Sequence, residues 1–259
     1  MNESYGYVLG VLDGDGCISS QPNHGKIEPI VKLEVTDRDF AEYFLTAIKN
    51  IAPWITASVG YRKAIADRGE VKDKQIVTVG ATKLLPLIRI AQAEKMESQK
   101  EPVVCAYLRG YFDSEGSITH YTVQASSINA QLIWHVETLL LNLGIKSRVY
   151  EHIKNNTKLP NNKFCSNAKE ITWIKICRYR SRKVFAEKVG FTIGRKQKAL
   201  QTALGSMQLG SYTDLQYQQA LKLRGNGAKL REIAHQIKVP MGTVCHWVIK
   251  KSTPWEAKK

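Results

Sequence analysis

The segment VLGVLDGDG at residues 8–16 returns in altered form as YLRGYFDSEG at residues 107–116. At an offset of 100 residues, the first glycine, both acids and the closing glycine of each segment coincide. The coincident pairs are Gly10 with Gly110, Asp13 with Asp113, Asp15 with Glu115, and Gly16 with Gly116. A motif that occurs only twice indicates a duplicated domain rather than a solenoid, which needs many repeats.

Each repeat also carries two small residues four positions apart, which lie on one face if the segment is helical. These residues are Gly10 and Gly14 in the first repeat, and Gly110 and Ser114 in the second. Small residues at this spacing allow two helix backbones to approach closely. We therefore predict that the two motif helices pack across a pseudo-twofold axis. Gly16 and Gly116 are expected to end these helices in the left-handed conformation.

This packing would place Asp15 beside Glu115 at the last turns of the two helices. A carboxylate at a helix C-terminus opposes the helix dipole by about 0.3–1 kcal/mol, and two adjacent carboxylates repel each other. A bound divalent cation reverses both costs, and magnesium prefers one or two carboxylates together with waters and phosphate oxygens. Such an ion can activate water and stabilise both oxygens of an in-line phosphodiester displacement.

Hydrophobic periodicity predicts the same order of elements in both halves. Val31, Leu33 and Val35 alternate with polar residues, as in a strand with one wet face, while Phe40, Phe44 and Ile48 have helical spacing. Further strands are expected at 72–80, 118–127, 147–153 and 170–180, further helices at 81–95, 128–145 and 181–190, and a loop at 154–170. Each half therefore reads as helix, strands, helix, strands, helix.

The pattern changes after about Gly205. Three short helices are expected at 214–224, 230–237 and 241–249, and Pro240 lies in the turn before the last of them. Residues 206–259 contain nine Lys or Arg and three Asp or Glu, which is a net charge of +6. We predict a unit of helix-turn-helix type here. The expected domains are therefore 1–100, 101–205 and 206–259.

The composition favours a polyanionic partner. The chain holds 38 Lys and Arg against 23 Asp and Glu, a net charge of +15, which favours nucleic acid binding over a merely basic surface or ribosome association. The five cysteines include no CxxC pair, which argues against a zinc ribbon or a disulfide framework and suits a reducing compartment. No apolar run has membrane-spanning length, so we expect an intracellular protein, either cytoplasmic in a prokaryote or organellar.

The two motifs resemble those of the LAGLIDADG homing endonucleases in their monomeric, two-motif form, and the resemblance covers about residues 1–205. It implies an α+β fold with two pseudo-symmetric αββαββα halves, whose saddle-shaped antiparallel sheets lie in the DNA major groove. It also implies a monomer that hydrolyses both strands of double-stranded DNA at a long target site and leaves short 3′ overhangs. The implied cofactor is Mg²⁺ or Mn²⁺, and Ca²⁺ would bind without supporting cleavage.

The resemblance also implies roles for individual residues. Asp15 and Glu115 match the catalytic, metal-ligating position, and the carbonyl groups of Gly14 and Ser114 are possible further ligands. Asp13 and Asp113 match the motif acid that stabilises the helices. Lys196 resembles a basic residue near the active site, and Lys95 is its counterpart by position, although either could be a solvated surface lysine. Arg109 replaces a small motif residue and either points away from the interface or contacts DNA.

Base readout is expected from polar side chains at alternate positions of the strands. The candidates are Lys32, Glu34, Thr122, Gln124, Ser126, Arg178 and Arg180. Such side chains can pair with base edges in the major groove, but a plain solvent-exposed sheet face predicts the same letters. In the last unit, the helix that begins at Met241 would present Thr243, His246 and Lys250 to DNA. Alternatively, its helices merely pack against the rest of the chain.

The leading hypothesis is an intron-encoded, site-specific DNA endonuclease. Two alternatives stay open: a non-catalytic transcription regulator built on the same scaffold, and a maturase that assists RNA splicing. Both motif acids are present, which favours the enzyme because a pure binder has no use for their mutual repulsion. An intein is not expected, because the chain opens with Met and lacks a junction Cys or Ser and a terminal His-Asn pair.

Overall fold

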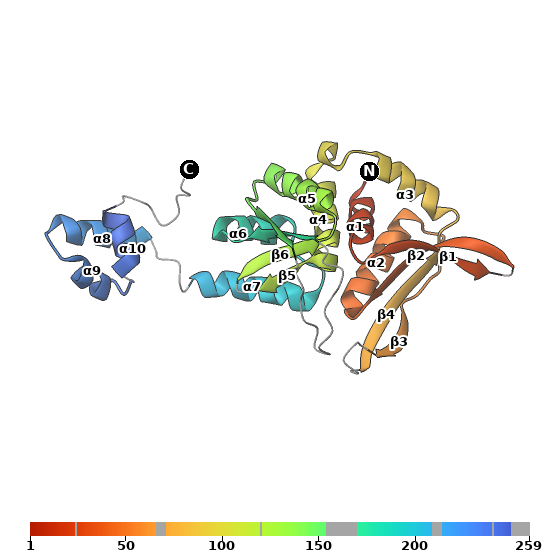
Figure 1. Cartoon of the computed structure of the whole chain (residues 1–259), viewed down its shortest axis with the longest axis horizontal. Helices are drawn as coiled ribbons and strands as arrows, with labels where there is room; N and C mark the ends of the chain where they lie inside the picture. The colour runs from red at the N-terminus through yellow and green to blue at the C-terminus, as the bar shows by residue number, and fades with distance from the viewer. Residues whose placement is uncertain are drawn as a thin grey trace. The chain divides into compact units, whose positions relative to one another are not determined.

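The computed structural model of the protein describes residues 1–23, 25–65, 71–119, 121–153, 170–208, 214–239 and 241–249. The chain forms two compact units, Met1–Ala203 and Leu204–Lys259. Each is considered by itself below (Figure 1). Among the described helices, none combines the length and apolar character that crossing a bilayer requires.

The first half of the larger unit runs from a motif helix through two pairs of strands. Its elements are α1 (Glu3–Leu12), β1 (Cys17–Asn23), β2 (Lys26–Val35), α2 (Arg38–Ile51), β3 (Gly60–Ile65), β4 (Val71–Gly80) and α3 (Leu84–Ala93). A short 3₁₀ turn at Met96–Ser98 leads to the second half. The strands form an antiparallel sheet in the order β1-β2-β4-β3.

The second half repeats this order. Its elements are α4 (Glu101–Glu115), β5 (Ser117–Thr119), β6 (Thr122–Ser127), α5 (Ala130–Asn142), β7 (Arg148–Ile153), β8 (Glu170–Ile176), α6 (Tyr179–Lys188) and the additional helix α7 (Gly194–Gln208). Its sheet has the equivalent order β5-β6-β8-β7. The prediction of an α+β fold with two antiparallel sheets is confirmed.

The apolar periodicity of the sequence corresponds to the observed core. Val31, Leu33 and Val35 of β2 are buried, and so are Phe40 and Phe44 on one face of α2. Burying a large apolar side chain contributes about 1.5–3 kcal/mol, so these positions fix which face of each element turns inward. The opposite face of each sheet carries the polar residues.

Two predicted strands differ from the observed ones. The strand expected at 118–127 is a tight hairpin, in which Tyr121 has a φ of +64° between β5 and β6. The strand expected at 170–180 stops at Ile176, where the ladder with β6 has its last pair, Val123↔Ile176, and the chain beyond it enters α6. Arg178 therefore precedes α6, and Arg180 lies inside it. The prediction that these two arginines share a strand face is wrong.

The motif-closing glycines also differ from expectation. Gly116 has φ −81° and ψ 148°, which is extended backbone, and Gly16 has no positive φ either. A side chain at Gly116 would place Cβ closer than 3.0 Å to the Phe112 carbonyl oxygen, and at Gly16 it would lie 3.0 Å from the Val11 carbonyl oxygen. These positions therefore require glycine because the chain turns tightly from helix into strand.

The smaller unit contains the three helices expected from its sequence. They are α8 (Asp214–Gly225), α9 (Leu230–Gln236) and α10 (Met241–Val248). Their contacts form one apolar cluster of Ala220, Ile233, Ile237, Val239, Val244 and Trp247. The backbone amide of Lys229 donates to Glu232 at 3.0 Å and so caps the start of α9.

Candidate active site

Helices α1 and α4 pack along their small residues and form the junction between the two halves (Figure 1). A Cβ added to Gly10 would lie closer than 3.0 Å to the Tyr107 carbonyl oxygen, and one added to Gly110 would also lie closer than 3.0 Å to the Tyr7 carbonyl oxygen. Further along the junction, a Cβ at Gly14 would overlap the side chain of Ser114. The two backbones are therefore in direct contact along one face of each motif helix.

Two crossed hydrogen bonds lock this junction. The Tyr7 hydroxyl donates to Asp113 at 2.8 Å, and the Tyr107 hydroxyl donates to Asp13 at 2.6 Å. Asp113, which is buried, also accepts a hydrogen bond from the Thr192 backbone amide at 3.0 Å. Burial raises the pKa of Asp113, and its hydrogen bonds to Thr192 and Tyr7 oppose that rise. Asp13 and Asp113 are thus occupied in joining the helices.

The two tyrosines were not among the residues that the sequence singled out. Tyr7 and Tyr107 obey the same 100-residue offset as the motif letters, so extending the repeat three residues upstream of its first glycine identifies them. Their pairing partners belong to the opposite half in each case. The signal was present in the repeat itself.

Asp15 and Glu115 come together at the end of this junction. Loss of surrounding water is the main cause that raises the pKa of both carboxyl groups, and the charge of Asp15 raises the pKa of Glu115 further. In the part of the chain that the structure describes, neither carboxylate accepts a hydrogen bond. Asp15 is exposed to solvent, and Glu115 is partly buried. The structure therefore brings together two acids to whose oxygens no described residue donates a hydrogen bond.

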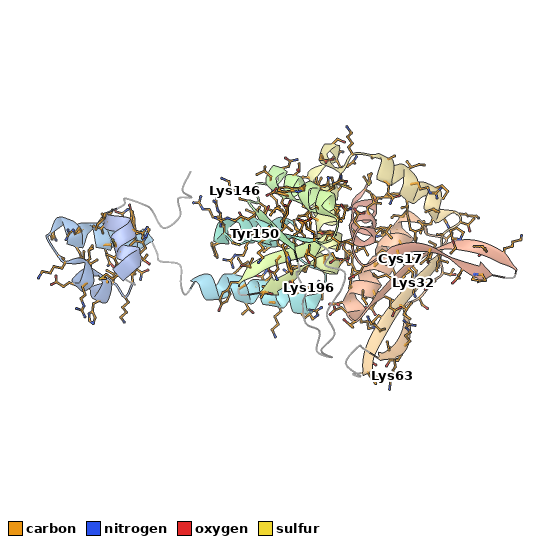
Figure 2. The ribbon with its side chains drawn as sticks, in the orientation of Figure 1. Cys17, Lys32, Lys63, Lys146, Tyr150 and Lys196 are labelled. Carbon is orange, nitrogen blue, oxygen red and sulfur yellow. The ribbon has the colours of Figure 1, made fainter. Side chains whose placement is uncertain are left out.

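Lys196 of α7, which Figure 2 labels, belongs to the sequence segment RKQK, and its charge acts on both acids. Its ammonium group donates to the carbonyl oxygens of Phe112 at 3.2 Å and Asp113 at 2.5 Å, at the C-terminal end of α4. Burial lowers the pKa of Lys196, and the negative charges of Asp113 and Asp15 oppose this effect. Its charge in turn lowers the pKa of both Asp15 and Glu115.

Lys95 is not brought to this site. It is exposed beside Glu97, and it is not among the charges that act on Asp15 or Glu115. The first half instead contributes Lys74 of β4, whose charge lowers the pKa of Asp15. Lys74 lies in the polar segment KDKQ, which looks like an ordinary solvated strand, so only the folded register reveals its position.

The residues present fit a hard divalent cation. Asp15 and Glu115 offer carboxylate oxygens that repel each other and accept no hydrogen bond from any described residue. Gly14 and Ser114, whose carbonyl groups are further candidate ligands, directly precede these acids in the sequence. No cluster of three or more His, Cys, Asp and Glu side chains able to hold a metal occurs among the residues described. A site with two carboxylates leaves positions for waters and phosphate oxygens, which is the coordination that Mg²⁺ prefers.

The outer face of the first sheet carries a row of polar side chains. The strand register aligns Cys17, Lys32 and Thr78 across β1, β2 and β4, and Figure 2 labels the first two of these residues. Glu34 lies between two cations, 3.3 Å from the Lys32 ammonium and 2.5 Å from the Arg62 guanidinium, and the bond to Arg62 lowers its pKa. The candidates Lys32 and Glu34 are therefore paired with each other as well as open to a ligand.

The outer face of the second sheet differs in chemistry. Thr122, Gln124 and Ser126 lie on one side of β6, and Gln124 is in register with Lys175 and through it with Arg148. The Lys175 ammonium lies 5.5 Å from the ring centre of Tyr150 and 5.7 Å from that of Trp173. The sequence did not single out four residues of this face: Arg148, Tyr150, Trp173 and Lys175. The alternation in the segment EITWIKI could have indicated two of them, because it places Trp173 and Lys175 on one face.

The remaining candidates lie elsewhere. Arg109 donates to the Val189 carbonyl oxygen at 2.5 Å, so it binds the C-terminal end of α6. Thr243 is partly buried and His246 exposed on α10, whereas Lys250 lies outside the described residues.

Tyr111 provides a test of the junction. Its hydroxyl is buried and has no hydrogen-bond partner among the described residues, and burial with the nearby Glu115 and Asp13 carboxylates raises its pKa. A buried polar group without a partner costs about 1–3 kcal/mol, so Tyr111→Phe is expected to raise the free energy of unfolding. Tyr7→Phe is the matched control, and it should lower that free energy because it breaks the bond to Asp113. Chemical denaturation measures both, and a destabilised Tyr111→Phe would contradict this assignment.

Paired motif helices with two acids at one end, each leading into a four-stranded antiparallel sheet, define the LAGLIDADG class of fold. Residues 102–190 match the family model described as a LAGLIDADG-like domain. A solved structure of the homing endonuclease I-DmoI in complex with DNA and Ca is 17% identical, with a TM-score of 0.56, over 78% of this chain and 100% of that chain. A structure of mesophilic variants of I-DmoI is also 17% identical, with a TM-score of 0.53, over 73% of this chain and 92% of the other.

Relatives in sequence come from the archaeon Methanocaldococcus jannaschii. Its uncharacterized protein MJ0314 is 30% identical over 61% of this chain, and the match spans 60% of the length of that relative. Its uncharacterized protein MJ0398 is 27% identical over 78% of this chain and 71% of its own length. Residues 102–190 thus match a LAGLIDADG-like domain, and the chain shares the fold of the homing endonuclease I-DmoI.

Proposed function

We propose that the protein is a site-specific endonuclease that hydrolyses both strands of double-stranded DNA at a long target site, with short 3′ overhangs, and that it is intron-encoded. The observation that carries this proposal is the meeting of Asp15 and Glu115, from distant stretches of chain, with no hydrogen-bond donor to either carboxylate among the described residues. The repulsion between the two carboxylates lowers the stability of the folded chain, and a bound cation would offset that repulsion. The resident ion is Mg²⁺ or Mn²⁺, whereas Ca²⁺ binds without supporting cleavage.

The chemistry divides between the ion and the side chains. When bound, the ion supplies Lewis-acid stabilisation and an activated water. Asp15 and Glu115 would hold the ion through their carboxylates, with the carbonyl groups of Gly14 and Ser114 as further ligands. Lys196 keeps a positive charge beside both acids, where negative charge accumulates as the phosphodiester is attacked. Because Lys196 is anchored on the end of α4, this charge is already in position before substrate arrives.

DNA recognition uses the outer faces of the two sheets. On the first sheet, Lys32 and Glu34 read base edges. On the second sheet, base edges are read by Thr122, Gln124 and Ser126. Lys175 and Arg148 of the second sheet provide positive charge for the DNA backbone. The net charge of +15 favours association with the DNA backbone. One chain supplies both sheets, so the protein acts as a monomer in an intracellular compartment.

The smaller unit is a helix-turn-helix module in this proposal. Its second and third helices, α9 and α10, would place Thr243 and His246 against DNA. Thr243→Ala is expected to weaken duplex binding by about 1–3 kcal/mol if Thr243 meets a base edge, without changing the cleavage rate of bound DNA. Gel-shift titration and single-turnover cleavage separate these two quantities. An unchanged affinity of Thr243→Ala for the duplex would show that Thr243 does not contact a base.

The test of function is cleavage of a plasmid that carries the fused flanks of the host intron, in buffer with Mg²⁺. Linearisation by the wild-type protein, with strand ends mapped on both sides, supports the endonuclease. Tight, saturable binding without a single nick in Mg²⁺ or Mn²⁺ would instead support a transcription regulator. Faster splicing of the cognate transcript, again without DNA cleavage, would support a maturase.

Lys196, which lies at the site, and Lys95, which does not, make a matched pair of substitutions. Lys196→Met is expected to lower the single-turnover cleavage rate by about a hundredfold, since it removes a positioned charge from the transition state. Lys95→Met removes the same charge from an exposed position and should leave the rate unchanged. Equal effects of the two substitutions would show that only the overall charge matters.

A further inference from the structure

A basic cavity lies at the far end of the second sheet, separate from the paired acids. Its volume is about 380 Å³, and it is lined by residues of α5, the start of β7 and the end of β8. Its charged walls are Lys146, Arg148, Lys175 and Arg178, opposed by Glu137 alone. Four cations against one carboxylate give the cavity a net charge of +3, so an anion is the ligand class that it favours.

The start of helix α6 supports the same ligand class. Ser147 is among the residues that line the cavity, but its hydroxyl is closed off from solvent, so the backbone at the helix start is the neutral donor group that a ligand can reach. Arg178 occupies the N-cap position of α6 and does not cap that helix with its side chain. The first backbone amides of a helix attract anions when no side chain caps them, and the cavity opens beside this helix start.

The cavity is continuous with the outer face of the second sheet. Lys175 and Arg148 belong both to the cavity wall and to the row that continues from Gln124 across that face (Figure 2 labels the neighbouring Lys146 and Tyr150). An extended anionic polymer on the sheet face would therefore reach the cavity at the sheet end. The cavity volume exceeds what an isolated phosphate needs and suits a phosphate with its sugar, near the low end of ligand pockets.

We propose that this cavity binds one phosphate group of the DNA backbone and so anchors the duplex at the end of the second sheet. The choice of DNA as the source of the phosphate rests on the function proposed above. The affinity of the cavity for a phosphate group does not depend on cleavage. Phosphate contacts position a protein on its duplex without reading sequence, so this site would set register and orientation.

The experiment removes two cavity charges and compares the result with a charge-matched control. The cavity variant is Lys146→Gln with Arg178→Gln. The control is Lys83→Gln with Arg89→Gln, two exposed residues at the N-cap position and on the surface of α3. Duplex affinity is measured over a range of salt concentrations. Since each neutralised phosphate contributes about 0.9 to the salt slope, the cavity variant should lose about that amount relative to wild type, and the control should lose none.

The rate at which Cys177 is alkylated reports whether the cavity holds a ligand, because this cysteine is exposed and lines the cavity. Its alkylation by neutral iodoacetamide, followed by peptide mapping, should slow when duplex DNA is added to the wild type or the control, but not to the cavity variant. Inorganic phosphate at high concentration should slow it in the same pattern, even with a protein that fails to cut DNA. Protection by inorganic phosphate but not by bound duplex would overturn DNA as the source. Equal salt slopes together with unprotected Cys177 would overturn the site itself.

Discussion

Replacing Asp15 with Asn, or Glu115 with Gln, is expected to reduce DNA cleavage at least about a thousandfold while leaving duplex binding nearly intact. Each substitution keeps the size of the side chain but removes the negative charge that would hold the ion. Lewis-acid stabilisation is worth several kcal/mol, and each 1.4 kcal/mol corresponds to about a tenfold rate change. Single-turnover cleavage on the mapped target measures the loss, and gel-shift titration measures binding.

The same substitutions should stabilise the metal-free protein at neutral pH. The pKa of each carboxyl group is raised in the folded chain, so the folded state binds the proton more tightly than the unfolded state does. The favourable contribution is then fully present below the ordinary carboxyl pKa and is lost as the pH rises through the raised value. In EDTA at pH 7, Asp15→Asn should therefore unfold at a higher denaturant concentration than wild type, with the difference shrinking on acidification.

Addition of metal should reverse the order of stability of the wild type and Asp15→Asn. Mg²⁺ is expected to raise the midpoint of wild-type unfolding through binding to the folded state, and to have little effect on Asp15→Asn. Asp13→Asn is a useful comparison because its carboxylate is occupied by Tyr107 and should influence stability more than the metal response. Full cleavage activity in both Asp15→Asn and Glu115→Gln would refute the proposed active site.

The second large effect is expected from a single methyl group in the helix junction. Gly10→Ala places a Cβ against the Tyr107 carbonyl oxygen, and Gly110→Ala places one against the Tyr7 carbonyl oxygen, closer than 3.0 Å in both cases. Because the obstacle is backbone rather than a flexible side chain, the helices must separate. Overpacking of this kind costs typically about 1–3 kcal/mol and occasionally more, and we expect the upper end.

Gly205→Ala is the matched control for this prediction. Gly205 also lies in a helix, but nothing lies within 4 Å of the Cβ that the substitution adds. Replacing an exposed helical glycine with alanine should stabilise by about 0.5–1 kcal/mol, so the two substitutions are expected to have opposite signs. Urea denaturation followed by circular dichroism measures both. A Gly10→Ala protein as stable as wild type would mean that the helices are not in backbone contact.

The repeat in the sequence was sufficient to predict the junction and the meeting of Asp15 with Glu115. That prediction succeeded because helical spacing and the duplicated motif both depend on residues close together in the chain. Apolar alternation likewise predicted the buried face of β2, because residues two positions apart in a strand, such as Val31 and Leu33, lie on the same face.

Other features depend on the folded register and left no clear local signal. Lys74 reaches the neighbourhood of Asp15 only because β4 pairs antiparallel with β2, whereas Lys95 has the more suggestive position in sequence. Arg178 and Arg180 continue the alternation of β8, but that strand ends at its last pair with β6, and the chain beyond it enters α6. The glycines that close the motifs are required by steric contact with the preceding turn, which composition alone does not distinguish from a left-handed cap.

The different chemistry of the two sheet faces has a consequence for the target. A symmetric dimer must present identical surfaces to both half-sites and so favours an inverted repeat. Here one surface holds Glu34 between two cations, whereas the other holds Lys175 between two aromatic rings. Under the proposed function, each surface specifies its own half-site, and the cognate DNA need not be a palindrome.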